Sequence, residues 1–140
     1  METRYPPKIV IDTNLIIAAR YNPKSASSKV IDLCIEHRLL ALYSEKTRNE
    51  NLNILLKVQP SNEYLIKIRL FFSKSIYIPD PTTRVNICSD YSDNKYFETA
   101  IDAGAQYIIS NDKHLLEHDG YYGVRVMRPS DFLKKFKSSS

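Results

Sequence analysis

Four acidic side chains lie far apart in the chain but have neighbours that could bring them to one place: Asp12, Glu50, Asp93 and Asp112. Asp12 directly follows the β-branched run at 9–11, and Asp112 lies just past the apolar run at 107–109. Runs of this length and type are typical of buried strands. We therefore expect two of the acids beside the ends of strands, with Glu50 in mid-helix and Asp93 at the start of a helix.

A cluster of carboxylates favours one kind of chemistry. Two like charges about 4 Å apart repel by a few kcal/mol at an effective dielectric of about 20, so such a cluster is either partly protonated or neutralised by a cation. Mg²⁺ and Mn²⁺ prefer oxygen ligands, and they activate water and stabilise charge on a phosphoryl group. A single aspartate after a strand often only caps a helix or shapes a turn. The prediction of a metal site therefore depends on the four acids together.

The elements that must position these acids alternate along the chain. Short apolar runs predict five strands, at 9–11, 39–43, 76–78, 107–109 and 124–127. Amphipathic stretches predict helices, over about 27–37, from Ser44 to Pro60, from Ser61 to 72, from Asp93 to Gly104 and from Ser130 to 136. This alternation predicts an α/β fold, a three-layer α/β/α sandwich around a parallel five-stranded sheet. Right-handed crossovers favour the strand order 3-2-1-4-5.

That strand order predicts where the acids meet. The first and fourth strands are neighbours at the point where the order reverses, and ligands bind there, outside the carboxyl ends of the strands. Asp12 and Asp112 are both expected at this point. Asp93 would lie near the same rim if the loop before it folds back. Glu50 has Ile54 at i+4, so this flank of its helix should lean toward the sheet.

Three segments resemble the motifs of PIN domains. Residues 9–14 resemble the opening strand and D-T-N motif, 92–100 resemble the D-D-N-K-F segment, and 105–116 resemble the A-D-Y-I-V-T-G-D-K-D-L-L segment. The resemblance runs from about residue 9 to 132 and is strongest to VapC-like PIN proteins, the toxins of toxin–antitoxin systems. It implies a PIN-like fold and a Mg²⁺- or Mn²⁺-dependent endoribonuclease that cuts single-stranded RNA, leaving 5′-phosphate and 3′-hydroxyl ends. It also implies a homodimer or higher homo-oligomer and an antitoxin protein as partner.

The resemblance also implies roles for single residues. The family's acidic positions correspond to Asp12, Asp93 and Asp112. Glu50 is the best match for the acid on the helix after strand two, and Glu45 in the first turn of that helix is its rival. Asn14 and Ser110 would be supporting polar groups that orient the acids or a water molecule.

The chain departs from the family pattern at three positions. Ser92 replaces the first Asp of D-D-N-K, with Asp90 nearby as a substitute. Asn111 stands where Gly is common, and His114 where Asp is common. None of these changes removes one of the main expected ligands.

Composition agrees with a globular protein that binds an anion. The 140 residues, 43% of them apolar, suit one domain over 1–136 with a frayed tail at 137–140. No apolar run approaches the ~20 residues of a membrane span, and the first residues lack the form of a signal peptide. Cys34 and Cys88 alone support neither a disulfide scaffold nor a thiolate zinc site. We therefore expect a cytoplasmic protein, whose net charge of +4 is a mild indication of nucleic acid as partner.

Basic and aromatic side chains near the acids are candidates for contact with RNA. We expect phosphate contacts from residues that flank the predicted cluster: Arg20, Lys24, Lys95 and Lys113. Bases could stack on tyrosines of the same rim, although packing or plain exposure explains each of them better: Tyr91, Tyr96, Tyr121 and Tyr122.

Other functions explain the sequence less well. Residues 114–118 spell the H-x-x-E-H pattern of some zinc peptidases, but only 22 residues follow it, which leaves little room for a further ligand and a substrate domain. A haloacid-dehalogenase-type phosphatase would need a second Asp where Asn14 stands. The alternative that stays open is an inactive or weakly active PIN scaffold that binds RNA.

Overall fold

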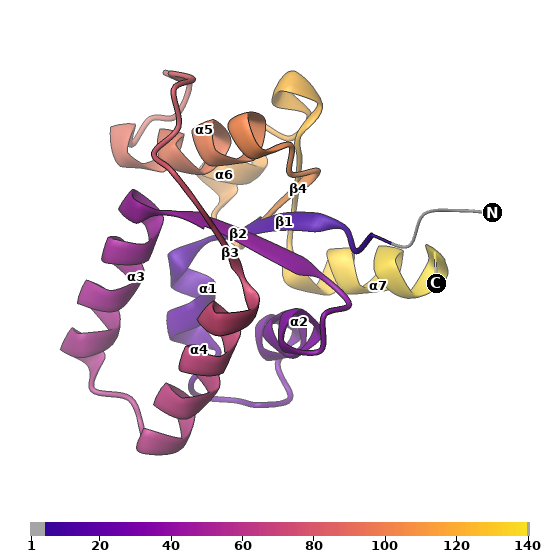
Figure 1. Ribbon diagram of the computed structural model, residues 1–140. Coiled ribbons are helices and arrows are strands. Elements are labelled where there is room, and N and C mark those ends of the chain that lie inside the picture. Colours follow the sequence, from indigo (N-terminus) through magenta and orange to yellow (C-terminus); the bar gives the residue numbers. More distant parts are fainter. Residues whose placement is uncertain (1–4, 140) are drawn as a thin grey trace.

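The computed structural model describes residues 5–139, without the side chains of residues 51, 52, 56, 138 and 139. Figure 1 shows helices on both sides of a central sheet. The elements follow one another as β1 (Lys8–Ile11), α1 (Thr13–Ala18), α2 (Ala26–Ile35), β2 (Leu40–Ser44), α3 (Glu45–Val58), α4 (Asn62–Lys74), β3 (Ile76–Ile78), the short 3₁₀ helix η1 (Tyr91–Asp93), α5 (Asn94–Ala103), β4 (Tyr107–Ile109), α6 (Lys113–Leu116), the 3₁₀ helix η2 (Tyr121–Gly123), β5 (Arg125–Met127) and α7 (Pro129–Ser139).

The sheet has the predicted topology. Its five strands are all parallel and lie in the order β3-β2-β1-β4-β5. Because β1 pairs with both β2 and β4, Val10 lies opposite Ile108 and Ile11 opposite Ile109. The carboxyl ends of β1 and β4 therefore meet at the edge where the strand order reverses, which is where this class of fold binds ligands.

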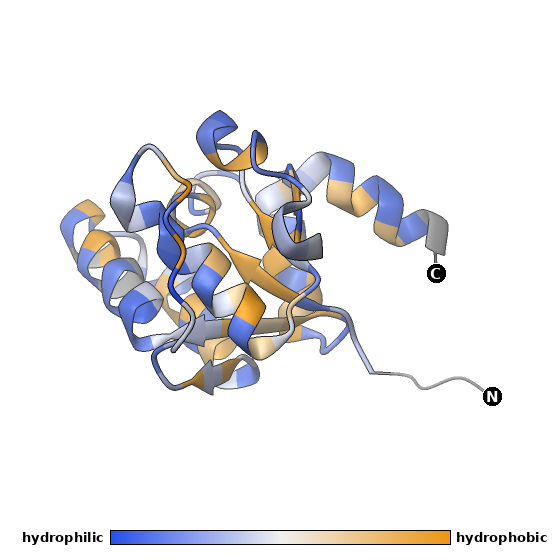
Figure 2. Cartoon of the chain, turned by 90° about the horizontal axis from the view of Figure 1, so that it is seen from above, coloured by the Kyte–Doolittle hydropathy of each residue, from blue (hydrophilic) through white to orange (hydrophobic). Residues whose placement is uncertain are grey.

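Alternate residues of the strands divide the apolar core into two layers. Ile9 and Ile11 pack on one side of the sheet, against buried residues of α1, α2, α4 and α7. Val10 and Ile108 pack on the other side, against α5 and α6. This is the period-two alternation expected of strands buried on both faces. Figure 2 shows hydrophobic strands at the centre and helices in which hydrophobic and hydrophilic residues alternate.

Local sequence signals explain where several helices begin and end. Ser44 caps α3 through a capping box with Thr47, and Ser61 caps α4 by accepting a hydrogen bond from the Tyr64 amide. Gly104 ends α5 with a φ of +71°, a conformation that glycine adopts without strain. The expected cap at Ser130 is wrong, because α7 begins one residue earlier at Pro129. Proline suits the first turn of a helix, where its missing N–H costs nothing.

Helix α7 continues to Ser139, past the expected domain limit at 136. Because residue 140 lies outside the described residues, the division into domain and tail stays a prediction. Both cysteine thiols are free and buried. None of the helices described within residues 5–139 combines the length and apolarity needed to cross a membrane.

Candidate active site

One pocket at the carboxyl edge of the sheet contains all four predicted acids. It has a volume of about 170 Å³. Its lining comes from α1, α3, η1, α5 and the segments after β1 and β4: Asp12, Thr13, Asn14, Glu50, Ile54, Asp90, Ser92, Asp93, Tyr96 and Asp112. The pocket wall is therefore formed by oxygen-bearing side chains from separate parts of the chain, and Ile54 is its single aliphatic residue.

Asp12 follows β1 and is held by two donors. Its carboxylate accepts a hydrogen bond of 2.7 Å from the Ser110 hydroxyl and one of 3.0 Å from the Asn14 amide. The second bond caps α1, so the aspartate has both a local structural role and a place in the pocket. The side chain is only 4% exposed, and this burial raises the pKa of the Asp12 carboxyl, against the opposing effect of the two hydrogen bonds.

Ser110 connects Asp12 to Asp112. Its buried hydroxyl donates to Asp12 and accepts a hydrogen bond of 2.9 Å from the Asp112 amide. The Asp112 carboxylate in turn caps α6 by accepting from the His114 amide at 2.9 Å. The two acids that follow neighbouring strands are thus linked through the hydroxyl of one serine.

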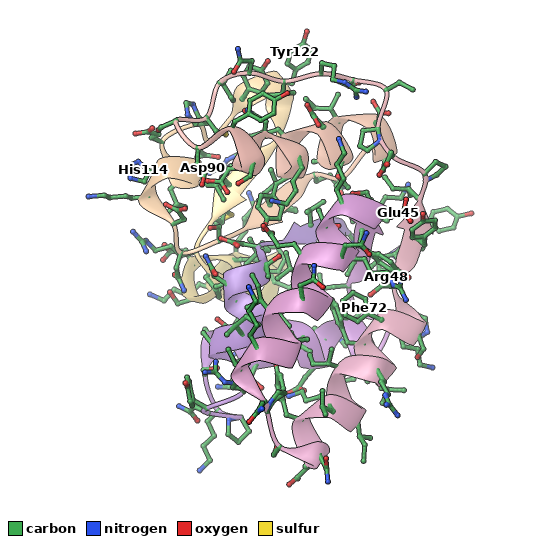
Figure 3. The ribbon with its side chains drawn as sticks, turned by 90° about the vertical axis from the view of Figure 1, so that its left-hand side faces the viewer. Glu45, Arg48, Phe72, Asp90, His114 and Tyr122 are labelled. Atoms are coloured by element: carbon green, nitrogen blue, oxygen red, sulfur yellow. The ribbon has the colours of Figure 1, made fainter. Side chains whose placement is uncertain are left out.

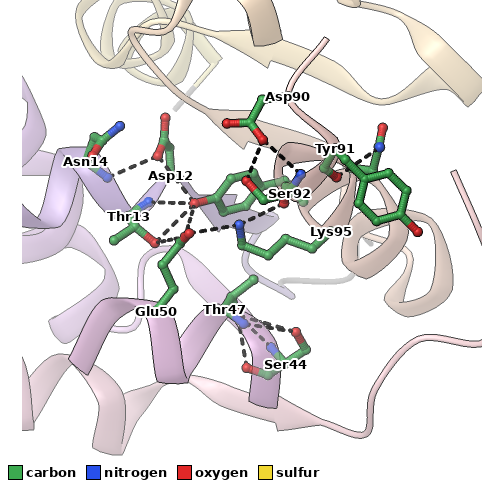
Figure 4. A network of polar contacts seen from close by, with 12 residues as sticks. Asp12, Thr13, Asn14, Ser44, Thr47, Glu50, Asp90, Tyr91, Ser92 and Lys95 are labelled. Carbon is green, nitrogen blue, oxygen red and sulfur yellow. Dashed lines mark hydrogen bonds and ion pairs between the residues drawn. The ribbon is translucent and has the colours of Figure 1, made fainter. Parts of the chain in front are cut away.

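Glu50 projects from the middle of α3 into the same pocket. Its Oε1 accepts hydrogen bonds of 2.9 Å from the Thr13 and Tyr96 hydroxyls, and its Oε2 binds the Lys95 ammonium at 3.1 Å (Figure 4). Glu45 is exposed in the first turn of α3, and Figure 3 shows it on the side of the helix away from Asp90. Of these two candidate glutamates, only Glu50 lines the pocket.

Asp93 reaches the pocket because the segment before α5 turns back over the sheet edge in the short helix η1. Desolvation, with the charges of Asp90, Asp112 and Asp12, raises the pKa of Asp93 to about 6, although Lys95 acts in the opposite direction. Asp90 also lines the pocket, but hydrogen bonds from the Ser92 hydroxyl and amide lower the pKa of its carboxyl.

Sequence reasoning missed the central role of Tyr96. The side chain is 2% exposed, and its hydroxyl accepts from the Thr13 amide at 3.2 Å and lies 2.9 Å from Glu50 and 3.4 Å from Asp12. The sequence alone suggests only a surface for base stacking. Its helical spacing from Asp93 could have indicated more, because a buried tyrosine hydroxyl on the sheet-facing side of α5 must find a polar partner.

The donor set of the pocket fits a hard divalent cation. Its charged ligands are carboxylates, without sulfur or imidazole nitrogen. Burial and mutual repulsion raise the pKa of Asp12 and Asp93, and a cation among them would relieve both effects. Within the described part of the chain, no three acidic, histidine or cysteine side chains stand close enough together to hold an ion. In this structure the charge of Glu50 is balanced by the Lys95 ammonium, with which it forms an ion pair.

The basic residues predicted to contact phosphate do not share one location. Lys95 lies beside the pocket, with its ammonium bound to Glu50 and to the Ser92 carbonyl. Arg20 lies in a different pocket, with Tyr64 and Lys67, and donates to the Ile17 carbonyl. Lys24 and Lys113 are exposed and line neither of these pockets.

Solved structures with the same fold include two of very different sequence. VapBC2 from Rickettsia felis, bound to a DNA fragment from their promoter, superposes with a TM-score of 0.59 at 13% identity, over 85% of this chain and 96% of that one. PAE2754 from Pyrobaculum aerophilum superposes with a TM-score of 0.55 at 16% identity, over 98% of this chain and 99% of that one. At such low identity these likenesses establish the fold.

Two sequence comparisons establish the family. The uncharacterized protein MJ1680 of Methanocaldococcus jannaschii is 32% identical over 143 aligned positions, which cover 93% of this chain and 92% of that protein. The family profile described as the PIN domain matches residues 8–114, which include all four acids of the pocket. The chain therefore belongs to the PIN domain family, whose members are generally nucleases.

Proposed function

We propose that this PIN protein is a Mg²⁺- or Mn²⁺-dependent endoribonuclease that cuts single-stranded RNA. The observation that supports it best is the single pocket lined by Asp12, Glu50, Asp93 and Asp112, whose carboxylates come from four different parts of the chain. Membership of a family of nucleases and the oxygen-only donor set support the same conclusion.

The four acids are proposed to hold the ion, which when bound supplies a Lewis acid that activates water and offsets charge on the scissile phosphate. The chain itself supplies the orientation. Ser110 fixes the carboxylate plane of Asp12, and Thr13 and Tyr96 fix Oε1 of Glu50. Such outer hydrogen bonds keep ligands in place, so that little reorganisation is needed when the substrate binds.

The direct test compares the wild type with Asp12→Asn on a fluorescent single-stranded RNA, with Mg²⁺, with Mn²⁺ and with chelator. Asparagine keeps the shape and the α1 cap of Asp12 but removes its charge. We expect cleavage by the wild type alone, abolished by chelator. Asp80→Asn is the matched control, because Asp80 is exposed and outside the pocket. Equal cleavage by Asp12→Asn and wild type would refute the site assignment, and RNA binding without any cleavage would favour the scaffold alternative.

We further propose that the protein is the toxin of a toxin–antitoxin pair and acts as a homodimer. The shared fold with VapBC2 of Rickettsia felis supports this role, and the partner would be an antitoxin protein that covers the acidic pocket. Expression of the wild type should arrest growth, whereas Asp112→Asn should not. Harmless expression of an enzyme that is active in vitro would contradict the toxin role. Light scattering should give twice the monomer mass of 16.2 kDa.

A further inference from the structure

A second pocket lies directly beside the acidic one and has the opposite charge. It has a volume of about 290 Å³. Its lining comes from α3, the loop before η1, η1 itself and α5: Lys46, Arg84, Tyr91, Ser92, Asn94, Lys95 and Glu98. Ser92 lines both pockets, and Lys95 lines this one while its ammonium binds Glu50 of the other. The two pockets are therefore neighbours across these two side chains.

Two of the three cations in this basic pocket are not neutralised by a carboxylate. Within residues 5–139, neither Lys46 nor Arg84 forms an ion pair. Arg84 uses one guanidinium nitrogen to donate to the carbonyls of Pro81 and Thr83, which leaves its other N–H groups for a ligand. The one acid of the lining, Glu98, is buried and accepts a hydrogen bond of 2.9 Å from the Val85 amide.

An aromatic ring stands at the same pocket with no packing partner among the aromatic pairs of the described chain. Tyr91 is 75% exposed. In Figure 4 its ring lies on the side of Lys95 that faces away from Asp12 and the other acids. Exposed aromatic rings beside cations are the combination that binds single-stranded nucleic acid, because bases stack on the ring while the cations bind phosphate.

We propose that the basic pocket binds the nucleotide next to the scissile phosphate of single-stranded RNA, with Lys46 and Arg84 on its phosphate and Tyr91 stacked on its base. The inference rests on the proposed function, since the acidic pocket must hold the scissile group. It assigns the substrate contacts to residues other than Arg20, Lys24 and Lys113. Lys95 marks the boundary at which the strand passes from one pocket into the other.

RNA binding without cleavage tests the subsite separately from the chemistry. A labelled single-stranded RNA is titrated with the Asp12→Asn protein in chelator, by fluorescence anisotropy, over a series of salt concentrations. Adding Lys46→Gln and Arg84→Gln should weaken binding about tenfold and reduce the slope of log K against log salt by about 1.4, or about 0.7 for each cation that no longer neutralises a phosphate. The control pair Lys29→Gln and Lys57→Gln removes two exposed cations outside both pockets and should change neither quantity.

A second pair of variants tests the stacking contact. Tyr91→Leu should weaken binding about tenfold, whereas Tyr91→Phe, which keeps the ring, should bind like the parent. Thermal melting of each variant checks that it folds. Unchanged affinity and salt slope after removal of both cations, or equal binding by Tyr91→Leu and Tyr91→Phe, would overturn the subsite. If the variants change RNA binding as expected but the wild type never cuts RNA, the nuclease proposal fails, and the basic pocket remains only as an RNA-binding site.

Discussion

Removal of one hydroxyl, in Tyr96→Phe, should disturb both the stability of the fold and the order of the acids. The hydroxyl is the partner of the buried Thr13 amide and lies 2.9 Å from Oε1 of Glu50. Phenylalanine keeps the ring, and with it the contact of the Lys95 ammonium 4.5 Å from the ring centroid. The change therefore isolates the polar contacts of the side chain from its packing.

The loss of stability in Tyr96→Phe comes from two contacts of the hydroxyl. A buried N–H left without a partner costs about 1–3 kcal/mol, and the loss of one hydrogen bond to Glu50 adds to it. We expect the free energy of unfolding to fall by about 2–3 kcal/mol, which corresponds to a melting temperature roughly 10 °C lower for a chain of this size. With one of its two hydroxyl donors gone, Glu50 should also bind Mn²⁺ about tenfold more weakly.

The assay is urea unfolding in chelator, followed by calorimetric titration with Mn²⁺. Tyr64→Phe is the matched control, because the Tyr64 hydroxyl is also buried but donates to the Ile16 carbonyl, outside the acidic pocket. Both variants should lose stability, but only Tyr96→Phe should lose affinity for Mn²⁺. Equal Mn²⁺ affinity in the two variants, or a Tyr96→Phe protein as stable as the wild type, would refute the role given to this hydroxyl.

Three further outcomes are expected. Glu50→Gln should reduce cleavage by about a hundredfold or more while Glu45→Gln leaves it unchanged, which parallel assays of the two variants will check. Mn²⁺ should raise the melting temperature of the wild type but not of Asp12→Asn, because binding to the folded state stabilises it. Hydrogen bonds from the Thr83 hydroxyl and from neighbouring amides lower the pKa of the Asp102 carboxyl. The ionised carboxylate therefore stabilises the folded protein above the pKa that Asp102 has in the unfolded chain. This stabilisation is lost as the pH falls through the lower pKa that Asp102 has in the folded protein. Asp102→Asn should therefore melt below the wild type at about pH 7, with the difference shrinking as the pH falls below about 3.9, the ordinary pKa of an aspartate.

The fold and the place where Asp12 and Asp112 meet followed from the order of apolar runs along the chain and from the parallel topology that this order implies. Short apolar runs placed β1 and β4 to within a residue, and parallel topology then put the segments after them side by side. Asp12 directly follows β1 and Asp112 lies three residues past the end of β4, so both must lie at the carboxyl edge of the sheet. Glu50 was harder to select, since Glu45 lies on the same helix and the side that faces the sheet depends on how α3 packs.

The sequence did not predict where Arg20 lies or which side chains of α3 and α5 contact each other. Both depend on the direction in which each helix runs and on how the helices pack. Arg20 is close to Asp12 in sequence, but the six residues of α1 carry the chain about 9 Å along a helix axis, away from the sheet edge. The contacts of Tyr96 and Lys95 with Glu50 join α5 to α3, and no periodicity within either helix reveals a partner on the other. The basic pocket escaped for the same reason, because Lys46 and Arg84 are 38 positions apart.

On the proposed function, the charges around Lys95 favour one order of binding for the metal ion and the RNA. One ammonium beside Glu50 cannot offset the remaining acids. Burial raises the pKa of Asp12 and Asp93, and the charges of the neighbouring carboxylates raise both further. An RNA strand lying across both pockets would be attracted by the basic one and repelled by the acidic one. Both pockets would attract the strand only with a cation bound among the acids. On the proposed function, a strand held in the basic pocket alone is bound but not positioned for cleavage, so we expect metal to bind before RNA binds productively.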